Sequence, residues 1–258
     1  MNIYICIILS LILAGLGFYK KAFTNIALLV AFLISFTMCY CGGYVAFCCL
    51  VLLFIITIVT DKIGKSKKKE IENNKHNKDN RRDVIQVLAN LLIATIFIIM
   101  YKFTNTKIYL IAFFVSLAES AADTSASGIG ILSKYSYNIL TFKKAEKGLS
   151  GNVSFIGFGA SLLAAIIIGS LYYIYSNSIS EMLIIVSLGF IGAIIDSILG
   201  CIQVKYKCTK CNMITEREFH CNKKTKYYKG IKYLNNDLVN FVSNISVCLI
   251  LLILNINL

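Results

Sequence analysis

The chain has 258 residues, of which 57% are hydrophobic and only 15% are charged. This composition excludes an ordinary soluble globular domain, in which about a quarter of the residues are charged. A formal net charge of +13 would indicate nucleic-acid binding in a soluble protein, but basic loops retained on one side of a membrane explain it without a nucleic-acid partner. We therefore predict a single all-α domain over residues 1–258, a polytopic integral membrane helix bundle.

About eight apolar stretches are long enough to cross a bilayer as helices. The first has neither the basic n-region nor the small-residue cleavage site of a signal peptide, so we interpret it as a membrane span. Because it is on the short side, a half-span, which would place one terminus on the other side of the membrane, is the alternative. The second and third are separated only by Gly42 and Gly43, which predicts a tight helical hairpin. The predicted spans cover approximately 2–19, 23–40, 43–60, 84–101, 108–132, 152–175, 181–204 and 238–256.

Basic residues are confined to alternate connections between these spans. Every Lys and Arg except Lys102 and Lys107 lies in the segments 20–21, 61–83, 133–151 or 205–237. The positive-inside rule predicts that these connections, and any site they flank, face the cytoplasm or an equivalent compartment. Residues 61–80 are rich in charge and low in complexity, which predicts a flexible basic loop.

Ionisable residues inside the spans are the first candidates for a functional site. Glu119 and Asp123 lie four residues apart, on one face of the fifth span. In the seventh span, one helix face carries a stripe of small and polar residues: Gly189, Gly192, Asp196, Gly200 and Gln203. Small residues around these acids also fit a close helix contact in which the acids are bonded internally, so packing is the alternative.

The eighth span opens with Asn236, Asp237 and Asn240, and carries Asn244 one turn deeper. Helix capping explains an Asn at the first position but does not explain Asn240 or Asn244. These side chains fall on the same predicted side of the membrane as Asp123 and Asp196. The pattern therefore predicts a polar pocket that opens to the cytoplasm.

Two other segments could bind phosphate at that side. The stretch GLSGNVS, from Gly148 to Ser154, leads into a helix whose N-terminal N–H groups suit an anion, although a plain turn is the alternative. Arg82, Gln86 and Asn90 share one edge of the fourth span, where snorkelling of the arginine is the alternative. Carboxylates beside such groups are typical of Mg²⁺-bound polyphosphate and phosphoryl transfer.

One cysteine pattern lies in a polar connection, the loop 205–233, which is predicted to be cytoplasmic. Two thiols spaced C-x-x-C and a later His-Cys pair supply potential tetrahedral zinc ligands for a structural knuckle. These ligands are Cys208, Cys211, His220 and Cys221. Adjacent ligands at His220 and Cys221 are awkward, so a three-cysteine site with another ligand is the alternative. The other cysteines lie in or beside apolar spans and indicate no disulfide framework.

Five ordered motifs resemble an integral-membrane family, domain of unknown function 92. It includes phytyl-phosphate kinase of plant and cyanobacterial vitamin E synthesis and the human transmembrane protein nineteen. The matching stretches are RRDVIQVLAN at 81–90, ADTSASGIG at 122–130, KGLSGNVSFIG at 147–157, GAIIDSILGCIQ at 192–203 and LNNDLVNFVS at 234–243. The loop CTKC…HC is also similar to prokaryotic members.

This resemblance implies a kinase that transfers a phosphoryl group from CTP to a phytyl, geranylgeranyl or farnesyl monophosphate. It implies catalytic roles for Asp123, Asp196 and Asp237, with Mg²⁺ at Asp123 and Asp196. The family's substrate and phosphate positions fall on Arg82, Gln86, Asn90, Thr124, Ser127, Gly148, Gly151, Ser154, Ser197, Gln203, Asn236 and Asn240. The chain departs from the family at Gly128, where the family usually has an acid, and at Asn152, where it usually has Gly. Glu119 is the candidate substitute for the missing acid.

Two other classes of function fit the same residues. A carrier or flippase for a phosphorylated lipid or small anion would use the buried acids to bind ions or protons. It would need polar groups at all depths of the membrane, whereas here they gather on one side. A non-catalytic membrane scaffold would use the acids for stability alone.

Overall fold

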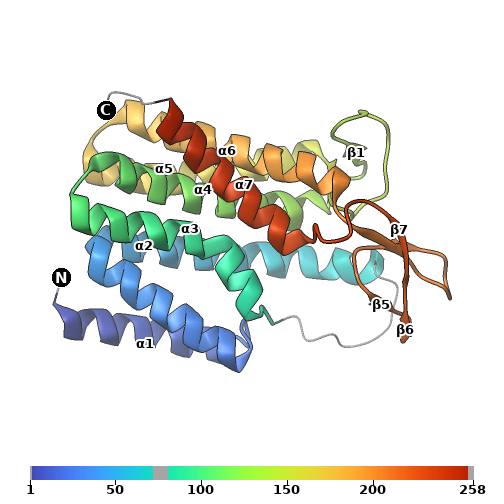
Figure 1. Ribbon diagram of the computed structural model, residues 1–258, viewed down its shortest axis with the longest axis horizontal. Coiled ribbons are helices and arrows are strands. Elements are labelled where there is room, and N and C mark those ends of the chain that lie inside the picture. The colour runs from blue at the N-terminus through green and yellow to red at the C-terminus, as the bar shows by residue number, and fades with distance from the viewer. Residues whose placement is uncertain (1, 72–80, 255–258) are drawn as a thin grey trace.

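The structure is a computed structural model that describes residues 2–71 and 81–254, and the described chain is mainly helical. The helices are α1 (Ile3–Tyr19), α2 (Asn25–Ile71), α3 (Val84–Thr104), α4 (Lys107–Gly130), α5 (Phe155–Ser176), α6 (Ile179–Ile202) and α7 (Asn236–Ile253). They lie side by side in one bundle (Figure 1). In the described chain, six helices are long and apolar enough to cross a membrane, and α1 is a shorter apolar helix. The predicted polytopic bundle is confirmed.

The long helix α2 is two helices joined at a sharp turn. Gly43 has φ 68° and ψ −155°, a conformation that glycine adopts readily because it has no Cβ. Figure 1 shows the chain reversing direction within α2. Its apolar part, Asn25–Gly64, would measure about 60 Å as a straight helix, twice the thickness of a bilayer core. The predicted hairpin is confirmed, and α2 counted as two arms brings the helices to the approximate number predicted.

The second arm of α2 differs from the expected flexible loop. It stays helical to Ile71, through the first half of the basic segment 61–80. Lys, the commonest residue in this part of the sequence, is favourable in helices, so the helix can continue beyond the apolar span. Residues 72–80 of the predicted loop lie outside the described residues.

The connections on one end of the bundle contain short antiparallel strands (Figure 1). β1 (Tyr137–Asn138) pairs with β2 (Asn152–Val153). The connection between α6 and α7 forms the β module, a three-stranded sheet of order β4-β3-β7 and a hairpin β5-β6. Its strands are β3 (Lys205–Lys207), β4 (Ile214–Thr215), β5 (Phe219–His220), β6 (Lys223–Lys224) and β7 (Lys226–Lys229). We call this the basic end, because the Lys-rich connections gather there and the short α3–α4 turn lies at the other end.

Helix α4 forms the centre of the bundle. It packs against α2, α3, α5, α6 and α7, and its residues from Leu110 to Ala122 are all buried. Ala, Ser and Gly dominate its second half, so neighbouring backbones can approach closely there. Glu119 is therefore enclosed by other helices and does not face lipid, while Asp123, just past this stretch, is half-buried.

An ion pair between the half-exposed Lys107 and the buried Glu181 ties the bundle together at the opposite end. Glu181 at the start of α6 is 5% exposed, and its carboxylate accepts hydrogen bonds from the Lys107 ammonium and the Tyr172 hydroxyl. Three helices meet at this carboxylate: α4, α5 and α6. A charged group at this depth is tolerated because it is paired and hydrogen-bonded.

Replacing Glu181 with Ala is expected to destabilise the protein by about 1–3 kcal/mol, because the buried Tyr172 hydroxyl loses its acceptor. Glu181→Gln keeps one acceptor oxygen and should lose less. Thermal unfolding in detergent measures both. An alanine variant as stable as the wild type would contradict a structural role for this contact.

Candidate functional site

Glu119 on α4 is almost fully buried and is held by α7. Its Oε1 accepts a hydrogen bond from Ser243 Oγ at 2.7 Å, and its Oε2 accepts one from Asn244 Nδ2 at 2.7 Å. Asn244 also donates to the Ser116 carbonyl at 3.0 Å, and both α7 side chains are fully buried. Asn235 caps α7, its side chain accepting from the N–H of Leu238. The interpretation that capping does not account for Asn244 is thereby confirmed.

Asp196 on α6 lies next to this group and is 8% exposed. Ser243 Oγ lies 3.4 Å from its Oδ2, and the Asn240 amide nitrogen, oriented to donate, lies 3.1 Å from the same oxygen. The carboxylate of Asp196 also interacts electrostatically with Asp123 and Glu119. The structure thus brings together Glu119, Asp123 and Asp196, which we call the acid cluster.

Helix α4 packs on the glycine stripe of α6 at Gly189 and Gly192, and the 148–154 loop packs on it at Gly200. A Cβ added at Gly192 would lie 2.3 Å from Glu119 Cγ, and one at Gly189 would lie 2.6 Å from the Ala118 Cβ. The sequence left open whether a ligand or another backbone approaches this stripe. At these two glycines it is the backbone and Glu119 of α4.

Arg82 lies beside the acid cluster, just before α3. Its N–H donates to the Ala22 carbonyl at 2.8 Å and its carbonyl accepts from Thr24 at 3.0 Å, so the α1–α2 turn fixes its backbone. Burial lowers the pKa of the Arg82 guanidinium, while Asp61 and Asp123 raise it. An arginine keeps its proton in such a setting, so Arg82 brings a fixed positive charge towards Asp123.

Gln86 and Asn90 are occupied within α3. Gln86 forms a capping box with Asp83, whose carboxylate accepts from the Gln86 N–H at 2.9 Å. Asn90 Nδ2 donates to the Gln86 carbonyl at 2.8 Å, and the Asn90 carbonyl accepts from Ser120 Oγ at 3.0 Å. Through Ser120, this edge of α3 reaches the residue next to Glu119. A substrate role for Gln86 and Asn90 stays a prediction.

Several other predicted residues make local contacts at the basic end. Ser127 donates to the Thr124 carbonyl, and Ser197 donates to the Ala193 carbonyl. The carbonyl of Asn236 accepts from the oriented Asn240 amide, and Asp237 interacts electrostatically with Asp83. Their functional roles also stay predictions.

Gln203, at the end of α6, differs from these residues. Its side chain is 1% exposed, and its Oε1 has no hydrogen-bond partner among the described residues. A buried acceptor without a partner is uncommon in folded proteins. Gln203 therefore keeps a free acceptor close to the basic end.

The loop from Gly148 to Ser154 folds against the end of α6. Gly148 and Gly151 have φ of 79° and 85°, and a Cβ at Gly151 would lie 2.6 Å from the Cys201 sulfur. Ser154 caps α5 by accepting from the Gly157 N–H at 3.1 Å. Both glycines are therefore required by the backbone conformation, and the Gly151 site also by its close contact with α6.

This loop binds a carboxylate from the β module. The backbone N–H and Oγ of Ser150 donate to the two oxygens of Glu216, at 2.6 and 3.0 Å. In this structure the Ser150 N–H group of the loop is occupied by the Glu216 carboxylate, and phosphate binding by the loop stays a prediction. Sequence reasoning missed Glu216, because nothing local connects it to a loop 66 residues away.

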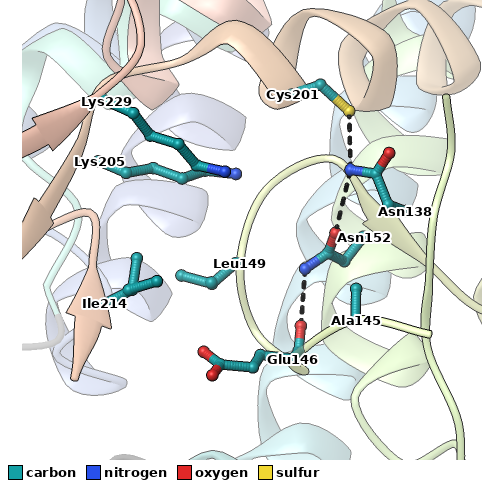
Figure 2. Close-up of a pocket in the computed structure, with 9 residues that line it drawn as sticks. All are labelled: Asn138, Ala145, Glu146, Leu149, Asn152, Cys201, Lys205, Ile214 and Lys229. Carbon is teal, nitrogen blue, oxygen red and sulfur yellow. Dashed lines mark hydrogen bonds between the residues drawn. The ribbon is translucent and has the colours of Figure 1, made fainter. Parts of the chain in front are cut away.

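A pocket of about 260 Å³ opens beside this loop (Figure 2). In Figure 2 the ammonium groups of Lys205 and Lys229 lie next to each other at its edge. Lys205 Nζ donates to the Ser150 carbonyl at 2.8 Å; burial lowers its pKa, and Glu216 raises it. The pocket is lined by Asn138, Ala145, Glu146, Leu149, Asn152, Cys201, Lys205, Ile214 and Lys229. Two adjacent cations suit an anionic ligand, and sequence reasoning had singled out neither lysine.

Gly128, where the resemblance implies an acid in relatives, is covered by the second arm of α2. A Cβ at this position would lie 3.0 Å from the Thr60 Cβ, and one at Gly64 would lie 2.5 Å from the Gly128 carbonyl oxygen. A carboxylate at position 128 would therefore require α2 to move. In this chain Glu119 is a third carboxylate near Asp123 and Asp196, and its role as a substitute for the acid stays a prediction.

Comparison with known proteins places the chain in a family. The model of the family described as "Integral membrane protein DUF92" matches residues 8–248. The chain belongs to this family. It is 28% identical over 200 residues to an uncharacterized membrane protein of Methanocaldococcus jannaschii, covering 77% of this chain and 82% of the relative. It is 26% identical over 265 residues to Protein PGR of Arabidopsis thaliana, covering 92% and 90%. No solved structure matches the chain.

The family membership confirms the resemblance drawn from the five motifs. The motif residues Asp123, Asp196 and Asn240 come from three separate helices and meet at one place near the basic end. That these residues belong to the family motifs and that they meet in space are independent observations. Together they make the acid cluster the candidate site.

Proposed function

We propose that this protein is a membrane-embedded kinase that transfers a phosphoryl group from CTP to an isoprenoid monophosphate, giving the diphosphate. The observation that carries the proposal is the acid cluster with Arg82 beside it. Carboxylates, an arginine and a loop that binds an anion occur together near one end of an apolar bundle. Phosphoryl transfer needs these components: ligands for a divalent cation and groups that hold phosphate.

Mg²⁺ is the metal that fits the acid cluster best. It takes oxygen ligands, usually one or two carboxylates together with water and substrate phosphates. Asp123 and Asp196 would hold it, because both Glu119 oxygens already accept hydrogen bonds from α7. When bound, Mg²⁺ neutralises charge on the phosphates.

The remaining residues bind and orient the substrates. Arg82 would bind a phosphate next to Asp123, and the loop from Gly148 to Ser154 would bind another through its N–H groups. The acceptor phosphate is already ionised at neutral pH, so positioning and charge neutralisation suffice without a strong general base. Its oxygen attacks the γ-phosphorus of CTP, the bond to the bridging oxygen breaks, and CDP leaves. The apolar spans would shelter the prenyl chain from water.

The reaction itself tests the proposal. Purified protein with CTP, Mg²⁺ and geranylgeranyl or phytyl phosphate should form the prenyl diphosphate and CDP. Uptake of a phosphorylated lipid into liposomes without a covalent product would instead support the carrier. Variants of the acid cluster that change only stability would support the scaffold.

Lys205 is expected to contribute to nucleotide binding at the pocket. Lys205→Gln should raise the KM for CTP about tenfold or more, with a smaller effect on kcat, because a charge-assisted hydrogen bond contributes about 1.5–3 kcal/mol. Lys232→Gln, which neutralises an exposed lysine between the β module and α7, serves as the control. An unchanged KM for Lys205→Gln would exclude this pocket as the nucleotide site.

A further inference from the structure

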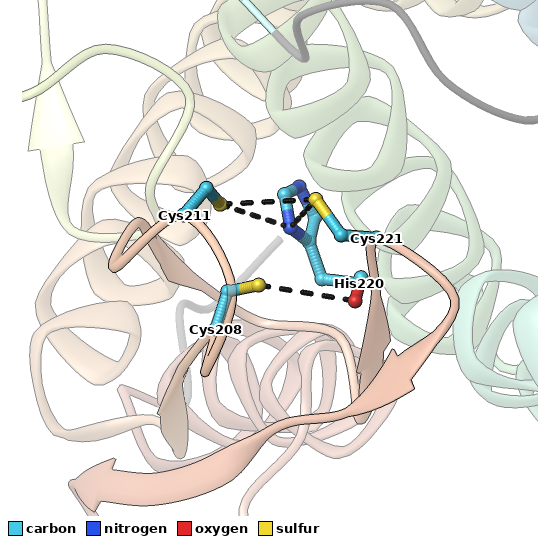
Figure 3. Close-up of side chains that lie close together, drawn as sticks. All are labelled: Cys208, Cys211, His220 and Cys221. Carbon is cyan, nitrogen blue, oxygen red and sulfur yellow. Dashed lines mark hydrogen bonds between the residues drawn. The ribbon is translucent and has the colours of Figure 1, made fainter.

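The β module brings four metal-ligating side chains together. The ligand atoms of Cys208, Cys211, His220 and Cys221 all lie within 4.8 Å of one another. Figure 3 shows the thiols of Cys211 and Cys221 and the His220 ring pointing towards a common centre. The two segments that supply them are a turn after β3 and the end of β5.

The three distances among Cys211, His220 and Cys221 are close to the edges of a zinc tetrahedron, and the Cys208 sulfur lies within 4.8 Å of the other ligand atoms. Zn–S bonds of about 2.3 Å and Zn–N bonds of about 2.05 Å predict S···S edges of about 3.8 Å and S···N edges of about 3.6 Å. The Cys211 and Cys221 sulfurs lie 3.8 Å apart, and they lie 3.4 and 3.3 Å from His220 Nδ1. A disulfide would require an S–S distance of about 2.05 Å, so these cysteines are not paired covalently.

The backbone explains how neighbouring residues can both be ligands. Cys221 and Asn222 have φ of 53° and 60°, a left-handed turn that folds the Cys221 side chain back towards His220. At the C-x-x-C turn, Asn212 has φ 58°, and the Lys210 N–H donates to the Cys208 sulfur at 3.4 Å. An N–H group directed at a thiolate is a common support for a metal ligand. The difficulty with adjacent ligands is therefore removed by the turn.

We propose that Cys208, Cys211, His220 and Cys221 bind one structural Zn²⁺, which closes the β module and thereby holds Glu216 on the 148–154 loop. Glu216 lies between Cys211 and His220 in the sequence, so ligands fix the chain on both sides of it. All four positions are taken by protein, which is typical of a structural rather than a catalytic zinc site. The strands of the module are only two to four residues long, and so small a unit gains much of its stability from a metal. This proposal does not depend on phosphoryl transfer.

Metal analysis of the purified full chain tests the site. The wild type and Cys48→Ala, which removes an exposed cysteine of α2 outside the cluster, should each contain about one zinc per chain. The double variant Cys208→Ser/Cys211→Ser should contain almost none. Wild-type protein without bound zinc, with iron in its place, or with undiminished zinc in the double variant would overturn the proposal.

A second measurement uses only the wild type, in case the double variant fails to fold. Alkylation followed by mass spectrometry should find Cys208, Cys211 and Cys221 protected until a chelator removes the metal, and protected again after Zn²⁺ is restored. Cobalt substitution should give the visible absorption of a tetrahedral thiolate site. Thiols that react equally with and without chelator would contradict the site.

Discussion

Replacing Asp196 with Asn is expected to lower kcat about a hundredfold or more while the protein keeps its fold. Asn has nearly the same shape and retains an oxygen that can accept from Ser243 or Asn240, but it removes a negative charge from the acid cluster. A neutral amide binds Mg²⁺ more weakly than a carboxylate, so the cation that neutralises the phosphates during transfer is held less well. Steady-state kinetics, with thermal unfolding in detergent as a check of folding, measures both effects.

Asp123→Asn should lower kcat by a similar factor, because Asp123 interacts electrostatically with both Asp196 and Arg82. The double variant should be little worse than either single variant, since residues that act as a unit are strongly non-additive. Glu218→Gln, which neutralises an exposed carboxylate on the β module, is the matched control and should keep its activity. Full activity in both single Asn variants would remove the acid cluster from the mechanism.

Replacing Gly192 with Ala is expected to cause one of the largest losses of stability from a single methyl group. The new Cβ would lie 2.3 Å from Glu119 Cγ and 3.1 Å from its Cβ, so α4 and α6 must separate or Glu119 must leave its hydrogen bonds to α7. Overpacking of this kind costs about 1–3 kcal/mol, which exceeds the gain of about 1 kcal/mol in helix propensity.

Gly159→Ala on α5 is the matched control, because nothing lies within 4 Å of its added Cβ. It should be neutral or slightly stabilising. Thermal unfolding of the two variants in the same detergent measures the difference. Equal stability of Gly192→Ala and the wild type would show that the two helices are not packed as closely as the structure has them.

The spans, the hairpin and the helix faces could be predicted from the sequence because they depend on local patterns. Apolar length marks a membrane helix, and Gly42-Gly43 marks a turn between two of them. The spacing of Gly189, Gly192 and Asp196 places them on one face of α6 regardless of what packs there. Polar residues that share a depth, such as Asp123, Asp196 and Asn240, could therefore be assigned to one site.

Contacts between distant segments could not be predicted in this way. The sequence does not show that α4 fills the glycine stripe, that Asn244 binds Glu119, or that Glu216 reaches Ser150. From the sequence, Gly128 is only a position where an acid is expected. The structure shows that the second arm of α2 covers this position. The length of α2 differs from the prediction for another reason: charge-rich, low-complexity sequence predicts a flexible loop, although the residues up to Ile71 are compatible with a helix.

The most direct test of the central claim is transfer of the γ-phosphoryl group of radiolabelled CTP by the purified protein in detergent or nanodiscs. The acceptors would be phytyl, geranylgeranyl and farnesyl phosphate, each with Mg²⁺ and with EDTA. We expect labelled prenyl diphosphate with the wild type and Mg²⁺, and almost none with EDTA or with Asp196→Asn. Folded wild-type protein that forms no labelled product with any of these acceptors, or with ATP, GTP or UTP as donor, would contradict the account.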